Sequence, residues 1–233
     1  MKKIISALLI SATALSSATF ANDNHYFYLG ADGGIFKADF DNAYIDQTDP
    51  IQQNFQQTVT QHGYTGGLVL GYQRAVGSQY FIGGEISNNW NSSDALYQEG
   101  ASSAAFSDKT QINSHMDFAV VPGLKISQTV TAFMKLGLSV AWMQDNLTSP
   151  AYPAGLYTPV TTYYSYKKTE TGFVAGLGVS KAICNHMDLF ASADYHDYGT
   201  VNFQSFQNFS ASYTHTSKVF SYDVLAGAAY RFV

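Results

Sequence analysis

The stretch AFMKLGLSVAW, residues 132–142, decides the fold. Every second residue is apolar: Ala132, Met134, Leu136, Leu138, Val140 and Trp142. Between them lie small, polar or charged residues as well as one aromatic: Phe133, Lys135, Gly137 and Ser139. Because successive side chains of a β-strand point to opposite faces, this pattern predicts a strand with one apolar face and one face that carries a lysine.

Seven other segments show the same alternation. They are residues 25–37, 62–74, 80–90, 115–125, 172–180, 187–196 and 220–232. The alternation predicts an all-β fold: an eight-stranded antiparallel up-and-down transmembrane β-barrel, with apolar side chains toward lipid and polar ones toward the lumen.

The composition agrees with a barrel in a membrane. Charged residues make up 12% of the chain and aromatic residues 15%, whereas a soluble domain carries about 25% charged residues. After the first residues, no run of about 18 apolar residues could form a membrane-spanning helix. The apolar character is therefore spread over alternating positions, as in barrel strands.

The lengths of the connections give an independent signal. Those near residues 75–79, 126–130 and 182–186 are short, whereas those near 38–61, 91–111, 144–169 and 198–217 each hold roughly 20 polar residues. Short turns that alternate with long loops are typical of outer-membrane barrels, whose long loops are external. We therefore expect four long external loops and both termini on the periplasmic side.

The mid-strand charges fall on the face opposite the apolar residues. This face is predicted to carry an interior ionic network with a structural role, in which Lys135 pairs with Glu85. Its expected members are Asp32, Glu85, Asp117, Lys135, Asp194, Asp223 and Arg231. A lysine or arginine that faced lipid at the bilayer midplane would cost roughly 2–4 kcal/mol, which explains the sorting.

Large aromatic residues on the apolar face cluster near the strand ends, where amphipathic rings favour the membrane interface. The residues expected at the periplasmic interface are Tyr72, Tyr80, Tyr230 and Phe232. Those expected at the outer interface are Tyr64, Trp90, Trp142, Tyr195 and Phe220.

Several motifs resemble a known family. FAVVPGLKI (118–126) followed by TAFMKLG (131–137) is similar to a hairpin of small outer-membrane barrels, the group of opacity-like surface proteins and the membrane domain of outer-membrane protein A. YLGA (28–31), GYQ (71–73) and GAAYRF (227–232) match the first, second and last strands of that group. The resemblance covers nearly the whole chain after residue 21 and implies the same fold and compartment.

Residues 1–21 read as a cleaved signal peptide. Lys2 and Lys3 precede an apolar run, and Ala18–Ala21 places small residues where a signal peptidase acts. We therefore expect residues 22–233 to form the barrel in the outer membrane of a Gram-negative bacterium. Expected partners are outer-membrane lipids and lipopolysaccharide, the barrel-assembly machinery during biogenesis, and a host or surface ligand at the loops. The chain has no basic cluster of the kind that binds nucleic acid.

Three functions stay open. The first is a structural or surface-interaction role, adhesin-like, through the external loops. The second is a narrow pore for ions or small solutes. The third is a lipid A-modifying hydrolase that uses His215 and Ser217, whose spacing is similar to that of lipid A deacylases with a lipid-facing His and Ser. The first is preferred, so no enzyme activity, cofactor or metal site is expected. His196 near Asp194 and Asp197, and His115 near Asp117, are weak metal candidates only.

Overall fold

A computed structural model describes residues 25–46, 54–92, 97–99, 106–151, 160–203, 206–208 and 211–232. The expected signal peptide, residues 1–21, lies outside these ranges. Within the described residues, no helix is long and apolar enough to cross a membrane.

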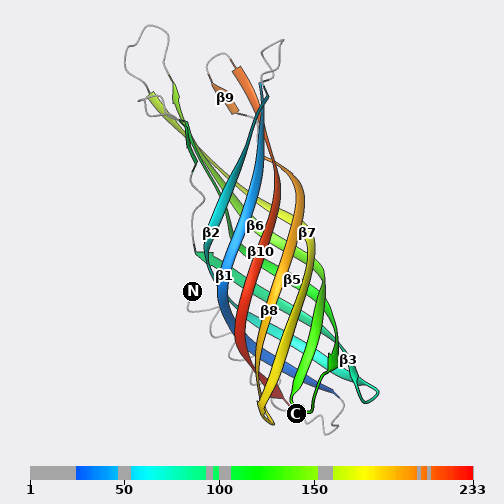
Figure 1. The fold of residues 1–233 in the computed structure, drawn as a ribbon. Coiled ribbons are helices and arrows are strands. Elements are labelled where there is room, and N and C mark those ends of the chain that lie inside the picture. Colours follow the sequence, from blue (N-terminus) through cyan, green and yellow to red (C-terminus); the bar gives the residue numbers. More distant parts are fainter. Residues whose placement is uncertain are drawn as a thin grey trace.

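Eight long antiparallel strands form a closed ring (Figure 1). They are β1 (His25–Asp46), β2 (Asn54–Val76), β3 (Tyr80–Ser92), β5 (Phe106–Lys125), β6 (Val130–Ala151), β7 (Val160–Cys184), β8 (Met187–Asn202) and β10 (Ala211–Phe232). Each pairs with its neighbour in the chain, and pairing of β1 with β10 closes the ring. Two three-residue strands, β4 (Tyr97–Glu99) and β9 (Phe206–Asn208), pair with β5 and β10. The predicted fold class is confirmed.

The three expected short turns are present at one end of the barrel, which the described termini share (Figure 1). The turn between β2 and β3 contains Gly77 with a φ of 70°, a conformation that favours glycine. At the same end Phe27 of β1 lies opposite Phe232 of β10. An even number of strands brings the first and last strands to the same end, which is the end predicted to be periplasmic.

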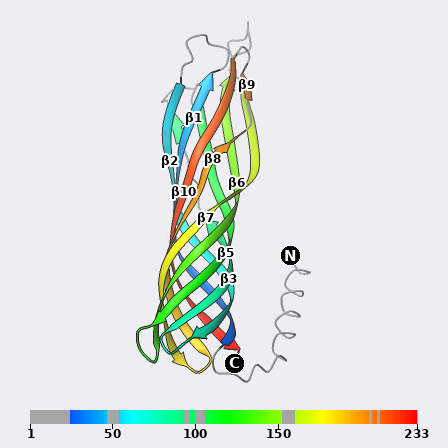
Figure 2. The same cartoon turned by 90° about the vertical axis from the view of Figure 1, so that its right-hand side faces the viewer.

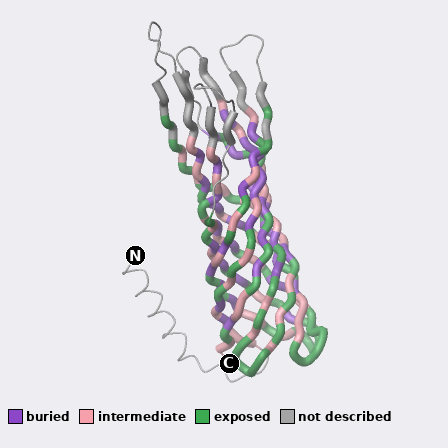
Figure 3. The backbone as a smooth tube through the Cα atoms, turned by 60° about the vertical axis from the view of Figure 1, so that its left-hand side comes forward, coloured by how far each residue is buried: buried purple, intermediate pink, exposed green. Residues whose placement is uncertain are grey.

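The lower part of the wall has an apolar outer face. Buried and exposed residues alternate along its strands (Figure 3). Among the predicted outer-interface aromatics, Tyr64 is 74% exposed, Trp90 and Trp142 are also exposed, and Tyr195 and Phe220 are half-buried. Trp90 and Trp142 lie at one level, because both are paired with Ser114.

The predicted periplasmic aromatics also lie on the outer face. Tyr80 and Tyr230 are exposed, whereas Tyr72 and Phe232 are half-buried. Tyr230 packs edge-on against Phe232, with 5.1 Å between ring centroids.

The expected extent of the external loops was wrong. Much of the four segments assigned to loops continues the barrel wall, which projects as a narrow tower above the aromatic residues (Figure 2). β1 and β2 remain paired up to Ile45 and Asn54, and β6 and β7 up to Ala151 and Val160. At about 3.3 Å per residue, the paired strands extend roughly 30 Å along the chain beyond the outer aromatics.

The projecting tower has the opposite polarity to the membrane part. Its interior holds an apolar cluster, here called the upper plug, together with buried polar side chains such as Gln61, Asp145 and His215. The members of this cluster are Phe36, Ala38, Phe40, Val59, Ile112, Ala141, Met143, Tyr198, Val201, Phe203 and Val219. Outward positions at this level carry polar residues such as Lys37, His62 and Lys218. This is the arrangement of a water-soluble β-barrel, so the strands persist without a lipid-facing apolar pattern.

Two β-bulges maintain the plug. The register shifts between Ile112 and Ser114 on β5 and between Val219 and Phe220 on β10, where β8 has its extra residue. Each extra residue changes which alternate positions face inward, so Ile112 and His115 both point into the barrel although one is even and the other odd. Gly199, with a φ of 65°, follows the bulge on β8.

The position of the membrane can be tested with one outward residue from each part. Leu136→Arg would place a charge toward lipid in the middle of β6. We expect it to lower the free energy of unfolding by roughly 2–4 kcal/mol in lipid vesicles, because the guanidinium would leave water. Tyr163→Arg, at an exposed position of the tower, should change it by no more than about 0.5 kcal/mol. Urea titration followed by a heat-modifiability gel measures both; equal effects would contradict the assignment of the membrane part.

Candidate functional site

A lysine with two carboxylates lies at the centre of the lumen. Lys135 Nζ of β6 is 3.0 Å from Glu85 Oε1 of β3 and 3.2 Å from Asp194 Oδ2 of β8. All three side chains are buried. Buried charges are costly unless they are paired and hydrogen-bonded, and this arrangement gives the ammonium group two partners.

Neighbouring hydroxyls complete the group around Lys135. The Tyr28 hydroxyl donates to Glu85 Oε2 at 2.6 Å, and Ser192 Oγ donates to Asp194 Oδ2 at 3.1 Å. Glycines make the room: a Cβ at Gly71 would overlap the Tyr28 ring, and one at Gly176 would overlap the Asp194 carboxylate. The glycine-rich inner face therefore lets large polar side chains fit in a narrow barrel.

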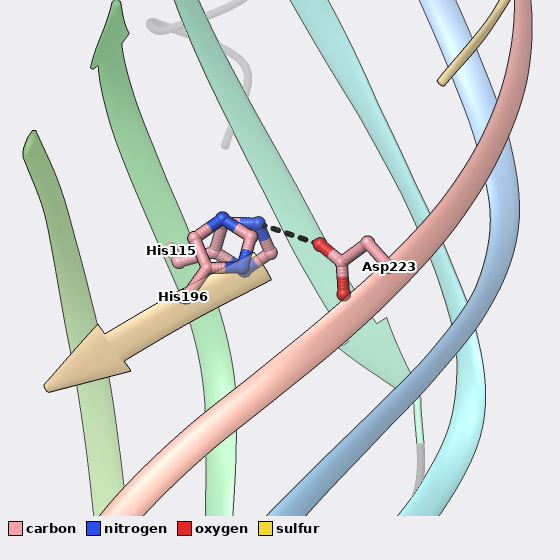
Figure 4. Close-up of side chains that lie close together, drawn as sticks. All are labelled: His115, His196 and Asp223. Carbon is pink, nitrogen blue, oxygen red and sulfur yellow. Dashed lines mark ion pairs between the residues drawn. The ribbon is translucent and has the colours of Figure 1, made fainter. Parts of the chain in front are cut away.

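A second polar layer combines two histidines and two aspartates. His115 Nε2 is 3.1 Å from Asp223 Oδ2, and His196 Nε2 is 3.2 Å from Asp117 Oδ2. Asp117 Oδ2 is also 3.9 Å from His115 Nε2. The imidazole rings are 4.7 Å apart between centroids. Figure 4 shows His115 and His196 together, with the ion pair from His115 to Asp223.

The remaining two residues of the expected network, Asp32 and Arg231, form no ion pair with the group around Lys135. Asp32 is half-buried, and its Oδ1 has no hydrogen-bond partner. Arg231 sits at the periplasmic mouth, where its Nε is 3.2 Å from Asp188 Oδ2 and its guanidinium lies 5.5 Å from the Tyr26 ring centre. The residues expected to form one network are thus distributed over a mouth, a lysine layer and a histidine layer.

The sequence prediction omitted His115, His196 and Asp188 from the network. The two histidines share the inward alternation of Asp117 and Asp194, which is the signal that could have found them. Among the described residues, His115, His196 and Asp223 also form the one group with three potential metal ligands, whose donor atoms all lie within 4.8 Å of one another.

The lipid A hydrolase alternative requires His215 and Ser217 to face lipid, and in the structure they do not. Both point into the tower and are only 2% and 1% exposed. His215 Nδ1 is 3.2 Å from Asp145 Oδ2, and its ring stacks on Phe203. The odd-numbered residues of β10 face inward from His215 to Arg231, so this expectation is corrected by the same alternation that predicted the barrel.

A charged pair lies on the wall of the tower, just above the apolar outer face of the lower part of the barrel. Lys37 Nζ donates to Asp39 Oδ2 at 2.6 Å, and Thr60 Oγ1 donates to Asp39 Oδ1 at 2.6 Å. Burial alone would raise the pKa of Asp39, but these hydrogen bonds outweigh it and hold that pKa below its ordinary value.

The model of the outer membrane protein beta-barrel domain family matches residues 6–232. The chain belongs to this family. Membership places this family member in the outer membrane of a Gram-negative bacterium. An uncharacterized protein of Coxiella burnetii (strain RSA 493 / Nine Mile phase I) is 28% identical over 256 residues, which cover 100% of this chain and 97% of that protein.

Solved structures of other outer-membrane barrels are also similar to this chain, at lower sequence identity. Ail, the attachment invasion locus protein of Yersinia pestis, shares 12% identity at a TM-score of 0.35, over 86% of this chain and 98% of that one. The outer membrane protein OprG of Pseudomonas aeruginosa shares 13% identity at a TM-score of 0.47, over 89% and 97%. Similarity of this degree does not indicate a function.

The pairing at Lys135 can be tested by removing its charge. Lys135→Met keeps the length of the side chain but leaves Glu85 and Asp194 buried without a cation. We expect this family member to lose about 3–5 kcal/mol of its free energy of unfolding, measured by urea titration in detergent. The matched control is Arg231→Met, which breaks a more accessible pair and should cost no more than about 1 kcal/mol. A Lys135→Met variant as stable as wild type would contradict the structural role.

Proposed function

We propose that this outer-membrane barrel is a surface-interaction protein that displays its outer connections on a rigid tower, and that it acts in attachment to a host or surface ligand. The observation that carries the proposal is the upper plug. A barrel that conducts solutes needs a continuous wet lumen, whereas here a cluster of buried apolar side chains packs inside the tower.

The packing of the plug supports a closed lumen. Phe40, Ile112, Val201 and Val219 are 0% exposed, and they come from four different strands. Below them, the lumen beside Tyr28, Glu85 and Lys135 contains a cavity of about 40 Å³, enough for roughly two or three water molecules. Surroundings of this kind favour a structural filling of the barrel over the narrow-pore alternative.

The tower supports a role outside the membrane. A scaffold that holds binding segments on paired strands limits the entropy they lose on binding. The connections from β1 to β2 and from β6 to β7, residues 47–53 and 152–159, contain Tyr, Gln, Thr, Pro and Asp, of which tyrosine offers rigid contact area.

The proposed lipid partner is lipopolysaccharide, together with the other outer-membrane lipids. The outward residues Lys37, Lys167 and Lys218 lie just beyond the outer aromatics on β1, β7 and β10, where they would meet anionic headgroups. We also propose that residues 1–21 are removed on export and that the barrel-assembly machinery inserts the chain.

Attachment can be tested by shortening the tip. Replacing residues 47–53 and 152–159 with short Gly-Ser turns leaves the described strands intact. We expect cells with this variant to show a normal heat-modifiable band but at least a tenfold loss of adherence to host cells or abiotic surfaces. The control replaces the periplasmic turn residues 127–129 in the same way and should adhere like wild type. Unchanged adherence of the tip variant would contradict the proposal.

Closure of the lumen is a separate prediction. In planar bilayers the wild-type barrel should show no steady single-channel current, because the upper plug packs across the lumen of the tower. The variant Phe40→Ala with Ile112→Ala should unfold more easily, by about 2–5 kcal/mol for each substitution. Steady wild-type currents would favour the pore instead.

A further inference from the structure

We infer that the second polar layer is a metal site, which binds one divalent transition ion of the Zn²⁺ class between His115, His196, Asp117 and Asp223. The four side chains come from β5, β8 and β10 and converge inside the barrel (Figure 4 draws three of them). The inference concerns the lumen and does not depend on the function proposed for the tip.

The donor atoms of His115, His196 and Asp223 already lie within 4.8 Å of one another. Asp117 stands beside this group, and its side chain would have to rotate to become the fourth ligand. The Nε2 and Oδ2 atoms are separated by 3.1 Å (His115 to Asp223), 3.2 Å (His196 to Asp117) and 3.9 Å (His115 to Asp117). In a tetrahedral site with bonds of about 2.0–2.1 Å, neighbouring donors are roughly 3.3 Å apart. Small rotations of buried side chains would close the group, and two imidazole nitrogens with two carboxylate oxygens are ligands that zinc accepts.

Hydrogen bonding accounts for only part of the cluster: Asp117 Oδ2 lies 3.2 Å from His196 Nε2 and accepts from Ser87 Oγ at 3.5 Å. His115 Nδ1 and Nε2, Asp117 Oδ1 and both carboxylate oxygens of Asp223 are buried and have no hydrogen-bond partner. A protonated imidazole needs an acceptor for each N–H. His115 Nε2 has Asp223 Oδ2 at 3.1 Å, but not in hydrogen-bond geometry, and Nδ1 has no acceptor. A cation bound at Nε2 of His115 and at Asp223 would satisfy these atoms together.

The charge of the surroundings also favours a cation. The buried carboxyl groups of the membrane part are Glu85, Asp117, Asp194 and Asp223. Lys135 is the fixed positive charge buried among them, and its ammonium already pairs with Glu85 and Asp194. Asp117 and Asp223 are therefore left to the two histidines. A divalent ion would neutralise both carboxylates while the imidazoles stay uncharged, which is the form that binds metals.

One neighbour prepares His196 as a ligand. Ser221 Oγ is 3.4 Å from His196 Nδ1. If Nδ1 donates to this hydroxyl, the lone pair of Nε2 points toward Asp117 and the other donors. Outer partners of this kind hold a ligand histidine in the required tautomer.

The location predicts slow exchange. The upper plug closes the tower above the cluster. On β6, Lys135 is nearer to the periplasmic end than Ala141, which is paired with His115. The ion would thus enter while the barrel folds and, once inside, would resist chelators.

The test measures metal content in the purified, folded protein. Wild type is unfolded in urea with a chelator and refolded in detergent with or without Zn²⁺, and the metal that remains after desalting is measured by mass spectrometry. We expect roughly one ion per chain, as in other closed four-ligand sites, and a higher urea midpoint with the ion than without it.

Two variants and one control make the test specific. Asp223→Asn and His196→Asn each remove one ligand and should weaken binding by more than tenfold. His215→Asn, which alters a buried histidine of the tower that pairs with Asp145, should bind like wild type. The heat-modifiable band verifies that each variant folds. Refolded wild type without bound metal, or equal binding by Asp223→Asn, would overturn the inference.

Co²⁺ gives a readout that needs no variant. Refolding of wild type with Co²⁺ should produce the intense visible absorption of a four-coordinate ion. Binding without this band would contradict the proposed ligand set, even if neither variant folds.

Discussion

The structure depends on one constraint: a charge or an unpaired backbone N–H or C=O group that faces the hydrocarbon of the membrane is costly in free energy. A closed ring of eight strands satisfies the backbone, because each strand pairs on both sides. Alternation satisfies the side chains by turning one face of each strand away from lipid. In an eight-stranded barrel the inner face encloses a space just wide enough for side chains. Every polar group turned away from lipid must therefore find its partners within a few ångströms, and the layers around Lys135 and His115 are the result.

Much of this arrangement could be predicted from the sequence where alternation is regular. In residues 132–142 and 220–232 the alternation is unbroken, so it predicts correctly which side chains point inward, including those of Lys135 and Asp223. The partner of Lys135 could be predicted as well, since few inward cations are available. That Arg231 pairs with Asp188 at the mouth could not, because alternation fixes the facing of a side chain and not its height in the slanted barrel.

The tower escaped prediction for two physical reasons. Above the membrane the outer face meets water, so Phe36, Ala38 and Phe40 lie inward while polar residues lie outward, the reverse of the pattern that identified the barrel. Moreover, the bulges near Asn113 and Tyr198 change the parity within β5 and β8. A segment rich in Asn, Gln and Thr, with a broken period, reads as a loop although much of its described backbone is paired.

The reversal of polarity along the same strands has a mechanical consequence. Below the level of Trp90 and Trp142 the outer surface is apolar. Above that level the outer surface is polar, and the upper plug lies inside. If the barrel shifted toward the periplasm by two residues along its strands, Lys37 and Lys218 would enter hydrocarbon. If the barrel shifted outward by the same distance, Leu138 and Phe173 would enter water. Each displacement is opposed by its own free-energy cost, so the junction anchors the height of the molecule, and with it the distance at which its tip stands from the cell surface.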